Sequence, residues 1–179
     1  EEQISRLEEV IASQPTALGK YLILDGIHSS DEIAFFRLVI KNIEEYMPLI
    51  YTPTVGEACQ KFSHIFRYAR GLYVSIKGRV REIIENCPNE EVDVIVVTDG
   101  QRILGLGDLG INGMGIPIGK LALYTACAGI NPQHVLPVTL DVGTNNESYL
   151  SDPLYLGLQQ KRVDGDDYYA LVQEFIEAA

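Results

Sequence analysis

The feature that most constrains the fold of this chain is an apolar, β-branched segment followed by a run of glycines. The segment VDVIVVTD at 92–99 is typical of a strand that is buried on both faces of a sheet. The glycine-rich stretch GLGDLGINGMGIPIGK follows at 105–120, and we expect a helix from about Ile116 to Ala128. A second apolar strand, HVLPVTLDV at 134–142, completes a strand–helix–strand unit.

The rest of the chain extends this unit into one α/β domain over residues 1–179, with no internal repeat, low-complexity segment or linker. We expect a mainly parallel sheet flanked by helices, with extra N-terminal helices. Beyond the strands and helix above, the patterns predict a strand at 72–76 and helices at 1–12, 31–47, 54–67, 79–86 and in a last segment after Asp164.

The second predicted helix has the clearest local signals. Asp31 can cap its first turn, and the apolar stripe consists of Ile33, Phe36, Ile40 and Ile43. This stripe and the apolar face of residues 1–12 exceed what a compact sheet domain needs, which indicates self-association.

Two further local patterns are specific enough to test. Thr54 and Glu57 have the spacing of a capping box at the start of the third helix. The Asp-Gly pair at 99–100 predicts a tight turn from the long strand into a short second strand, RILGL.

The composition excludes several classes of function. The net charge is −11, from 25 acidic and 14 basic residues, which argues against nucleic acid and anionic membranes as partners. No apolar run approaches the ~20 residues that a membrane span requires. The three cysteines, at 59, 87 and 127, are expected to be reduced, buried thiols. The chain begins at Glu1 without a methionine or a signal-like segment, so we expect it to be trimmed at its start.

The stretch GLGDLG at 105–110 fits the G-x-G-x-x-G fingerprint of dinucleotide-binding folds. In those folds the fingerprint follows the strand directly, whereas a hairpin is expected to intervene here. The fingerprint also requires an acid about 20 residues further on, but 125–132 reads TACAGINP. Asp141 ends a later strand and leaves the cofactor-loop alternative open.

Lys120 stands out because the segment around it is apolar. It is expected in the first turn of its helix, where the helix dipole and burial both disfavour a positive charge. Its pKa is therefore expected to fall, as a general base requires. The alternatives are an ammonium group that reaches solvent or one that pairs with an acid.

Two long motifs, IYTPTVGEACQKFSHIFR at 50–67 and VIVVTDGQRILGLGDLGINGMGIPIGKLALYTACAGI at 94–130, resemble the N-terminal domain of malic enzymes of the large-subunit type. VLPVTLDVGTNNESYLSDPLYLGLQQKR at 135–162 continues the resemblance. It implies oxidative decarboxylation of L-malate to pyruvate and CO₂, with NAD or NADP and a divalent Mg or Mn ion.

The resemblance also implies roles for three residues. Lys120, in GIPIGK, corresponds to the general base that accepts the malate hydroxyl proton. Tyr51, in YTPTVG, corresponds to the general acid that protonates C3 of enolpyruvate. Arg102, in DGQRILGLGD, corresponds to the residue that binds a substrate carboxylate. Taken alone, Tyr51 would be a packing residue and Arg102 a surface ion pair.

By the same resemblance, the metal ligands and the nicotinamide-binding domain would follow Ala179. We therefore expect no metal or cofactor ligands within 1–179, and no activity from this part alone. The acids DGDD at 164–167 are interpreted as a helix cap and first turn. Asp99, Asp108 and Asp141 are interpreted as turn or strand-end residues, and the three histidines have no assigned role.

The resemblance further implies a homo-oligomer, with a cytoplasmic location or, in a eukaryote, the mitochondrial matrix or a plastid. Two rival functions remain at this stage. One is a cofactor-binding module built on GLGDLG, and the other is a non-catalytic dimerisation module built on the N-terminal helices.

Overall fold

A computed structural model describes residues 1–179 and confirms an α/β fold around a parallel three-stranded sheet. The strands are β1 (Leu72–Ser75), β2 (Val94–Thr98) and β3 (Val135–Asp141), in the spatial order β1-β3-β2. Both pairs of strands are parallel, so the central strand β3 has a neighbour on each side.

Helices make up most of the remaining chain, and none of them is long and apolar enough to cross a membrane. The α-helices are α1 (Glu2–Ala12), α2 (Ala17–Ser30), α3 (Glu32–Lys41), α4 (Ile43–Ile50), α5 (Thr54–Gln60), α6 (Phe62–Ile65), α7 (Val80–Glu85), α8 (Gly115–Ala128), α9 (Glu147–Leu150) and α10 (Gly165–Ala178). Two short 3₁₀ helices, η1 (Gly110–Met114) and η2 (Pro132–His134), precede α8 and β3.

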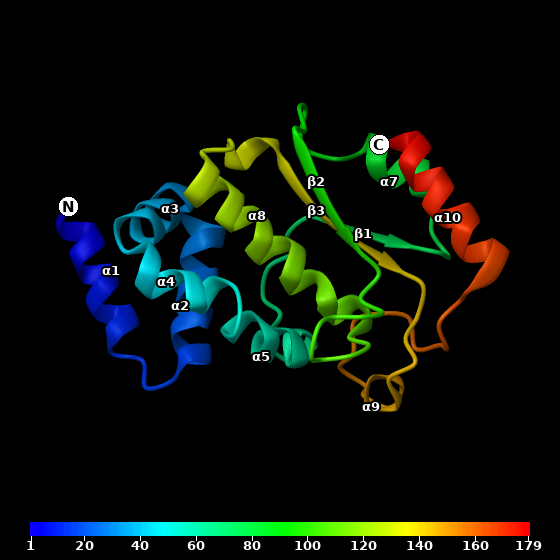
Figure 1. Ribbon diagram of the computed structural model, residues 1–179, viewed down its shortest axis with the longest axis horizontal. Coiled ribbons are helices and arrows are strands. Elements are labelled where there is room, and N and C mark those ends of the chain that lie inside the picture. Colours follow the sequence, from blue (N-terminus) through cyan, green and yellow to red (C-terminus); the bar gives the residue numbers. More distant parts are fainter.

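The strand order explains which helices cover which face. The β1-to-β2 connection passes across β3, and the β2-to-β3 connection then returns in the opposite direction. Because such crossovers are right-handed, a reversal of direction puts their helices on opposite faces of the sheet. Figure 1 shows α8 on one side of the sheet and α7 with α10 on the other.

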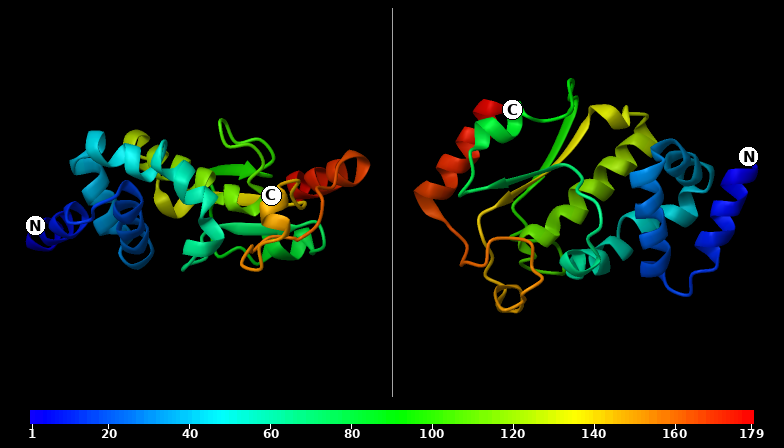
Figure 2. Two further views of the ribbon diagram at one scale, coloured as in Figure 1. Left: turned by 90° about the horizontal axis from the view of Figure 1, so that it is seen from below. Right: turned by 180° about the vertical axis from the view of Figure 1, so that it is seen from behind.

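The molecule is elongated, with the N-terminal helices at one end and α10 at the other (Figures 1 and 2). One apolar core lies between the sheet, α7 and α10, and includes Val74, Val138 and Phe175. A second core lies among α1 to α4 and extends to α8 through Ala122. The helix α8 therefore packs against the sheet on one side and the N-terminal helices on the other.

The prediction that 92–99 is buried on both faces is wrong. β2 is an edge strand, and the side chain of Val97 is exposed. The central position belongs to β3, in which every residue after Val135 is buried. Both segments are apolar, and composition alone does not tell the middle of a three-stranded sheet from its edge.

The N-terminal region differs most from expectation. The helix α2 was not predicted, because its apolar residues are not confined to one face. The single helix expected over 31–47 is two helices that meet at Asn42. The cap is confirmed, since the Asp31 carboxylate accepts a hydrogen bond from the Ala34 amide at 2.9 Å.

The predicted apolar stripe of this region is only half right. Phe36 is buried, but Ile33 is 71% exposed and Ile40 is 55% exposed. The face that packs inward instead contains Phe35, Leu38 and Val39. The predicted stripe therefore lies on the wrong face of α3, because apolar residues occur on several faces of this helix.

Two other local predictions are wrong. Thr54 is buried and makes no side-chain cap, and the single helix expected over 54–67 is two shorter helices, α5 and α6, separated by Lys61. The segment RILGL forms no strand, and its only β contact is an isolated bridge between Ile103 and Gly107.

The predicted strands at 72–76 and 134–142 and the helices at 1–12 and 79–86 are confirmed to within about two residues. The last helix is confirmed too, although Asp164 makes no side-chain cap. All three cysteines are reduced, but only Cys59 is buried.

Two glycines on α8 let other parts of the backbone approach closely. A Cβ atom at Gly119 would lie 2.5 Å from the carbonyl oxygen of Ile50, and one at Gly115 would lie 2.6 Å from the Cys59 sulfur. Both distances are too short for a side chain. The absence of a Cβ at these positions allows the α4–α5 segment to pack directly on α8.

This contact predicts opposite effects for two helical glycines. Gly119→Ala should lower the free energy of unfolding by about 1–3 kcal/mol, because the new methyl group collides with backbone. Gly26→Ala in α2 is the matched control, since a Cβ there meets nothing within 4 Å. It should stabilise by about 0.5–1 kcal/mol. Urea titration measures both, and equal stabilisation by the two changes would disprove the close approach.

Candidate active site

Tyr51 lies at the turn between α4 and α5. Its amide donates to the Met47 carbonyl at 3.0 Å, and its own carbonyl accepts from the Val55 amide at 2.8 Å. The following Thr52–Pro53 peptide bond is cis. The Tyr51 ring is half-buried and packs against an apolar cluster that includes Val55 and Leu109. The backbone of Tyr51 is therefore fixed at both sides, and its side chain leans on the core.

Lys120 lies in the second turn of α8, because the helix begins at Gly115 rather than Ile116. Its side chain is half-buried. Lys120 is therefore neither in the first turn of the helix nor fully buried, whereas the sequence predicts both. Its ammonium nitrogen lies 5.9 Å from the centre of the Tyr51 ring, in the geometry of a cation–π contact.

The structure thus brings together two of the three predicted site residues, from segments about 70 residues apart. The reason is the close approach at Gly119, where a Cβ would lie 3.1 Å from the Tyr51 ring. Since Lys120 is the next residue of α8, the missing side chain at Gly119 also brings Lys120 beside that ring.

Arg102 lies in the loop between β2 and η1 and is exposed. It makes no hydrogen bond or ion pair with the rest of the chain, so the ion pair considered from sequence does not form. The adjacent Ile103 packs against the same apolar cluster as Tyr51. The structure therefore leaves the guanidinium group of Arg102 available to a ligand, without joining it to Tyr51 and Lys120.

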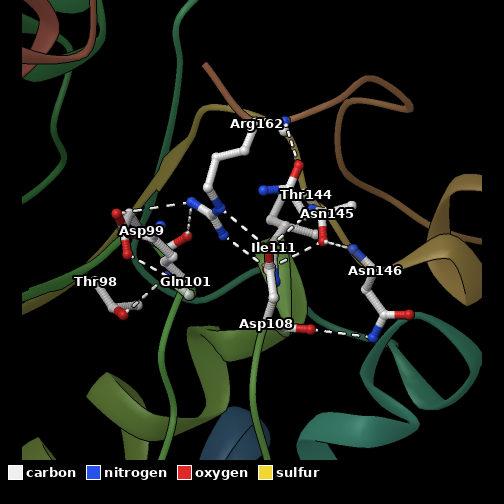
Figure 3. A network of polar contacts seen from close by, with 12 residues as sticks. Thr98, Asp99, Gln101, Asp108, Ile111, Thr144, Asn145, Asn146 and Arg162 are labelled. Carbon is white, nitrogen blue, oxygen red and sulfur yellow. Dashed lines mark hydrogen bonds and ion pairs between the residues drawn. The ribbon is translucent and has the colours of Figure 1, made fainter. Parts of the chain in front are cut away.

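The loop that holds Arg102 is closed at its base by Arg162 (Figure 3). The Arg162 guanidinium donates to both carboxylate oxygens of Asp108, at 2.8 and 3.1 Å, and to the Asp99 carbonyl at 3.0 Å. Only 4% of the Arg162 side chain is exposed. Asp99 and Asp108 thus begin and end a loop that one buried cation holds together.

Asp108 also joins the loop to the segment after β3. Its carboxylate accepts from the Gly110 amide at 2.9 Å, the Asn145 amide at 2.8 Å and the Thr144 hydroxyl at 3.0 Å. Burial on its own would raise the pKa of Asp108, but the hydrogen bonds from Arg162 and Asn145 outweigh it and lower that pKa. The ionised form of Asp108 is therefore the one that the fold stabilises.

Sequence reasoning missed Arg162, which has no local signal, and it interpreted Asp99 and Asp108 as turn residues. That interpretation is confirmed in part, because both accept backbone hydrogen bonds from residues two positions later. Asp141 behaves similarly, and its two oxygens accept from the Gly143 and Leu158 amides.

The glycine stretch does not match a dinucleotide loop. β2 ends at Thr98, and α8 begins only after Gly110, with η1 between them. The fingerprint therefore does not follow its strand directly, and the helix that begins at its last glycine is the 3₁₀ helix η1 rather than the α-helix of a dinucleotide-binding fold. The expected hairpin is absent, but the separation between strand and fingerprint remains.

No group of three or more His, Cys, Asp or Glu side chains in residues 1–179 is arranged to hold a metal ion. Asp166 and Asp167 lie in the first turn of α10, as expected. His64 and His134 pair with Asp152 and Asp93, at 2.6 and 3.1 Å. The residues present do not fit a divalent metal, so no chemical step is assigned to one within this chain.

The lowered pKa of Asp108 predicts a pH dependence of stability. A carboxyl group with a lowered folded-state pKa stabilises fully above its unfolded value of about 3.9, and this stabilisation is lost as the pH falls through the folded value. Asp108→Asn should therefore lower the free energy of unfolding by about 3 kcal/mol at neutral pH. The difference from the unsubstituted protein should shrink below about pH 4.

Urea titrations between neutral pH and the lowest pH at which the protein folds measure this difference. Asp166→Asn is the control, since Asp166 is exposed and accepts no side-chain hydrogen bond. It should cost less than about 1 kcal/mol, from the helix dipole alone. If both variants lost the same free energy of unfolding, Asp108 would contribute no more than an exposed carboxylate, and its ion pair with Arg162 would not stabilise the fold.

Comparisons with known proteins agree with the resemblance. The family model described as "Malic enzyme, N-terminal domain" matches residues 28–179. The chain is 54% identical over 180 residues to "NAD-dependent malic enzyme 2" of Vibrio vulnificus, covering 99% of this chain and 32% of that protein. It is also 54% identical over 180 residues to "NAD-dependent malic enzyme 1, mitochondrial" of Arabidopsis thaliana, covering 98% of this chain and 29% of that protein.

A further relative, "NAD-dependent malic enzyme" of Salmonella arizonae, is again 54% identical, with 99% of this chain and 32% of that protein covered. The chain thus spans about a third of the length of the curated relatives it matches. The family match covers most of the chain and the identities extend over nearly all of it, so this chain belongs to the malic enzyme family and contains its N-terminal domain.

Proposed function

We propose that this chain is the substrate-binding and acid–base part of a malic enzyme. The reaction is oxidative decarboxylation of L-malate to pyruvate and CO₂, with NAD, as the names of the relatives suggest, or with NADP as the alternative. The observation that supports it most is the 5.9 Å contact between the Lys120 ammonium group and the Tyr51 ring.

This contact fits the reaction because its acid and its base act on neighbouring atoms. Malate loses a hydride from C2 and a proton from the C2 hydroxyl, and the bond from C3 to its carboxylate then breaks. After CO₂ leaves, C3 must gain a proton. A base near the C2 oxygen and an acid near C3 therefore have to face one small substrate from adjacent positions.

In this assignment the Lys120 side chain accepts the hydroxyl proton while C2 is oxidised. Tyr51 donates the proton that C3 requires. The nicotinamide cofactor supplies the hydride acceptor and the divalent ion supplies Lewis acidity when they are bound. Neither has ligands assigned in residues 1–179, so we place both sites in the remainder of the full-length protein and expect residues 1–179 to be inactive alone.

Arg102 is the proposed ligand of a malate carboxylate. A guanidinium group matches a carboxylate with two parallel hydrogen bonds. The support is that Arg102 has no polar partner within the chain, whereas the loop that presents it is fixed by the buried Arg162. A loop that is held at its base and carries an unpaired guanidinium group is suited to binding a small dianion.

A homo-oligomer is also proposed, in the cytoplasm or, for a eukaryotic protein, in an organelle. Its support is a set of exposed apolar side chains on α1, α3 and α4: Val10, Ile33, Ile40 and Met47. These side chains would also suit a purely structural dimerisation module, but such a module does not require the contact between Lys120 and Tyr51.

Replacing Lys120 tests the proposed base. In the full-length enzyme Lys120→Ala should lower kcat about 10²- to 10⁴-fold with a much smaller change in the KM for malate. Lys120→Arg should not restore activity, because a guanidinium group stays protonated. Lys77→Ala, at an exposed lysine after β1, is the control. If the folded alanine variant stayed within threefold of the parent kcat, the base would lie elsewhere.

Replacing Tyr51 tests the proposed acid separately from the base. Tyr51→Phe should slow pyruvate formation by about 10²-fold or more while hydride transfer survives, because the acid acts after decarboxylation. Turnover measured as pyruvate and single-turnover NADH formation distinguish the two steps. Tyr169→Phe, at an exposed tyrosine of α10, should change neither. Unchanged pyruvate formation in Tyr51→Phe would remove Tyr51 from the mechanism.

A further inference from the structure

A cavity of about 190 Å³ lies at the amino ends of β1 and β3, away from the loops that hold Arg102. Its polar wall comes from α2, α3 and the segment before β1, through His28, Glu32 and Arg70. Its apolar wall includes Phe36 of α3 and Leu121 of α8. None of these residues takes part in the proposed malate chemistry.

Arg70 is a largely buried cation whose hydrogen-bonding capacity is mostly unused. Its side chain is 24% exposed, and its only hydrogen bond is to the Ser29 hydroxyl, at 3.2 Å. The nearest carboxylate, that of Glu32, lies 3.9 Å away. A guanidinium group has five N–H donors, and burial makes unused donors costly. Burial also lowers the pKa of Arg70, against the opposing influence of Asp25 and Glu32.

Two more groups that face the cavity have unused hydrogen-bonding capacity. The His28 side chain is 8% exposed and makes no hydrogen bond within the chain, although it stacks on Phe35. Burial holds the pKa of His28 well below its usual value, so the imidazole is neutral. One Glu32 oxygen is held by Gln133, while the other lies 3.8 Å from His28 and accepts no hydrogen bond.

These groups have the charge pattern of a receptor for a zwitterion. We propose that the cavity binds a small α-amino acid with an aliphatic side chain. Arg70 binds the carboxylate through two of its N–H groups, and Glu32 accepts from the ammonium group. Phe36 and Leu121 contact the side chain. The imidazole of His28 supplies one further hydrogen bond.

Charge balance favours a zwitterion over a simple anion. Arg70 lies near two acids, Glu32 and Asp25, so another isolated negative charge would be repelled. A zwitterion adds no net charge, and each of its ends meets a group of the opposite sign.

The volume has room for a small organic ligand. About 190 Å³ is many times the ~10–15 Å³ that a single ordered water requires on the same measure. The two apolar side chains beside the polar wall, those of Phe36 and Leu121, favour an aliphatic side chain such as that of alanine or valine. The inference does not rest on the malate reaction.

Calorimetric titration of the full-length protein with L-valine tests the proposal. We expect saturable binding by L-valine, and no saturable binding by 3-methylbutanoate, which lacks the ammonium group, or by 2-methylpropylamine, which lacks the carboxylate. Saturable binding by L-valine and 3-methylbutanoate with equal affinity would overturn the zwitterion. An absence of saturable heat from both L-valine and L-alanine at millimolar concentration would overturn the site.

Two substitutions connect the binding to these residues. Glu32→Gln keeps the shape of the side chain and removes its charge, and should weaken L-valine binding about tenfold or more. Arg70→Lys keeps the charge and removes the planar fork, and should weaken binding to a similar extent. Glu82→Gln and Arg79→Lys, in an exposed ion pair at the start of α7, are the matched controls. Parent-like affinity in both cavity variants would place valine elsewhere.

Discussion

The buried guanidinium group of Arg162 is the interaction on which the candidate site depends most. It joins Asp99, directly after β2, to Asp108 in the glycine-rich stretch, and it joins both to the segment after α9, where Arg162 itself lies. A buried ion pair contributes little net stability when both partners are present, but loss of one partner leaves a buried, unpaired charge. The pair therefore acts chiefly to exclude other loop conformations, and Arg102 is held in one region of the surface as a result.

The same loop shows why its glycines are needed. Gly100 and Gly110 both have positive φ values, and a Cβ at Gly100 would lie 1.9 Å from the Gly110 carbonyl oxygen. The backbone is thus folded on itself between the residues that Arg162 joins. A G-x-G-x-x-G pattern indicates only that close backbone approach is required. Here the approaching group is the chain itself, and the hairpin that was expected between the strand and the fingerprint does not form.

Much of the fold was predictable because periodicity and β-branched composition identify the strands and the long helix α8 directly. What could not be predicted depends on partners distant in the sequence. β2 is an edge strand because β3, which comes later in the sequence, pairs between β1 and β2. The contacts of Arg162 depend on residues 54 and 63 positions away. The candidate site shows the same limit. Local sequence singled out Lys120, whereas Tyr51 and Arg102 required the family resemblance.

The N-terminal helices, expected only as additions to an α/β domain, form one wall of the site. Tyr51 directly follows the last residue of α4, and α2 and α3 cover the side of α8 where Ala122 is buried. Without them, α8 would expose the apolar face that includes Ala122, and the turn that presents Tyr51 would lose the helix that leads into it. Because Gly119 contacts that turn while Leu121 faces the cavity beside Arg70, the position of Lys120 between them is determined from both sides of one helix. The contact between Lys120 and Tyr51 therefore results from how the helical bundle packs on α8, and the sheet holds α8 and the Arg102 loop in place.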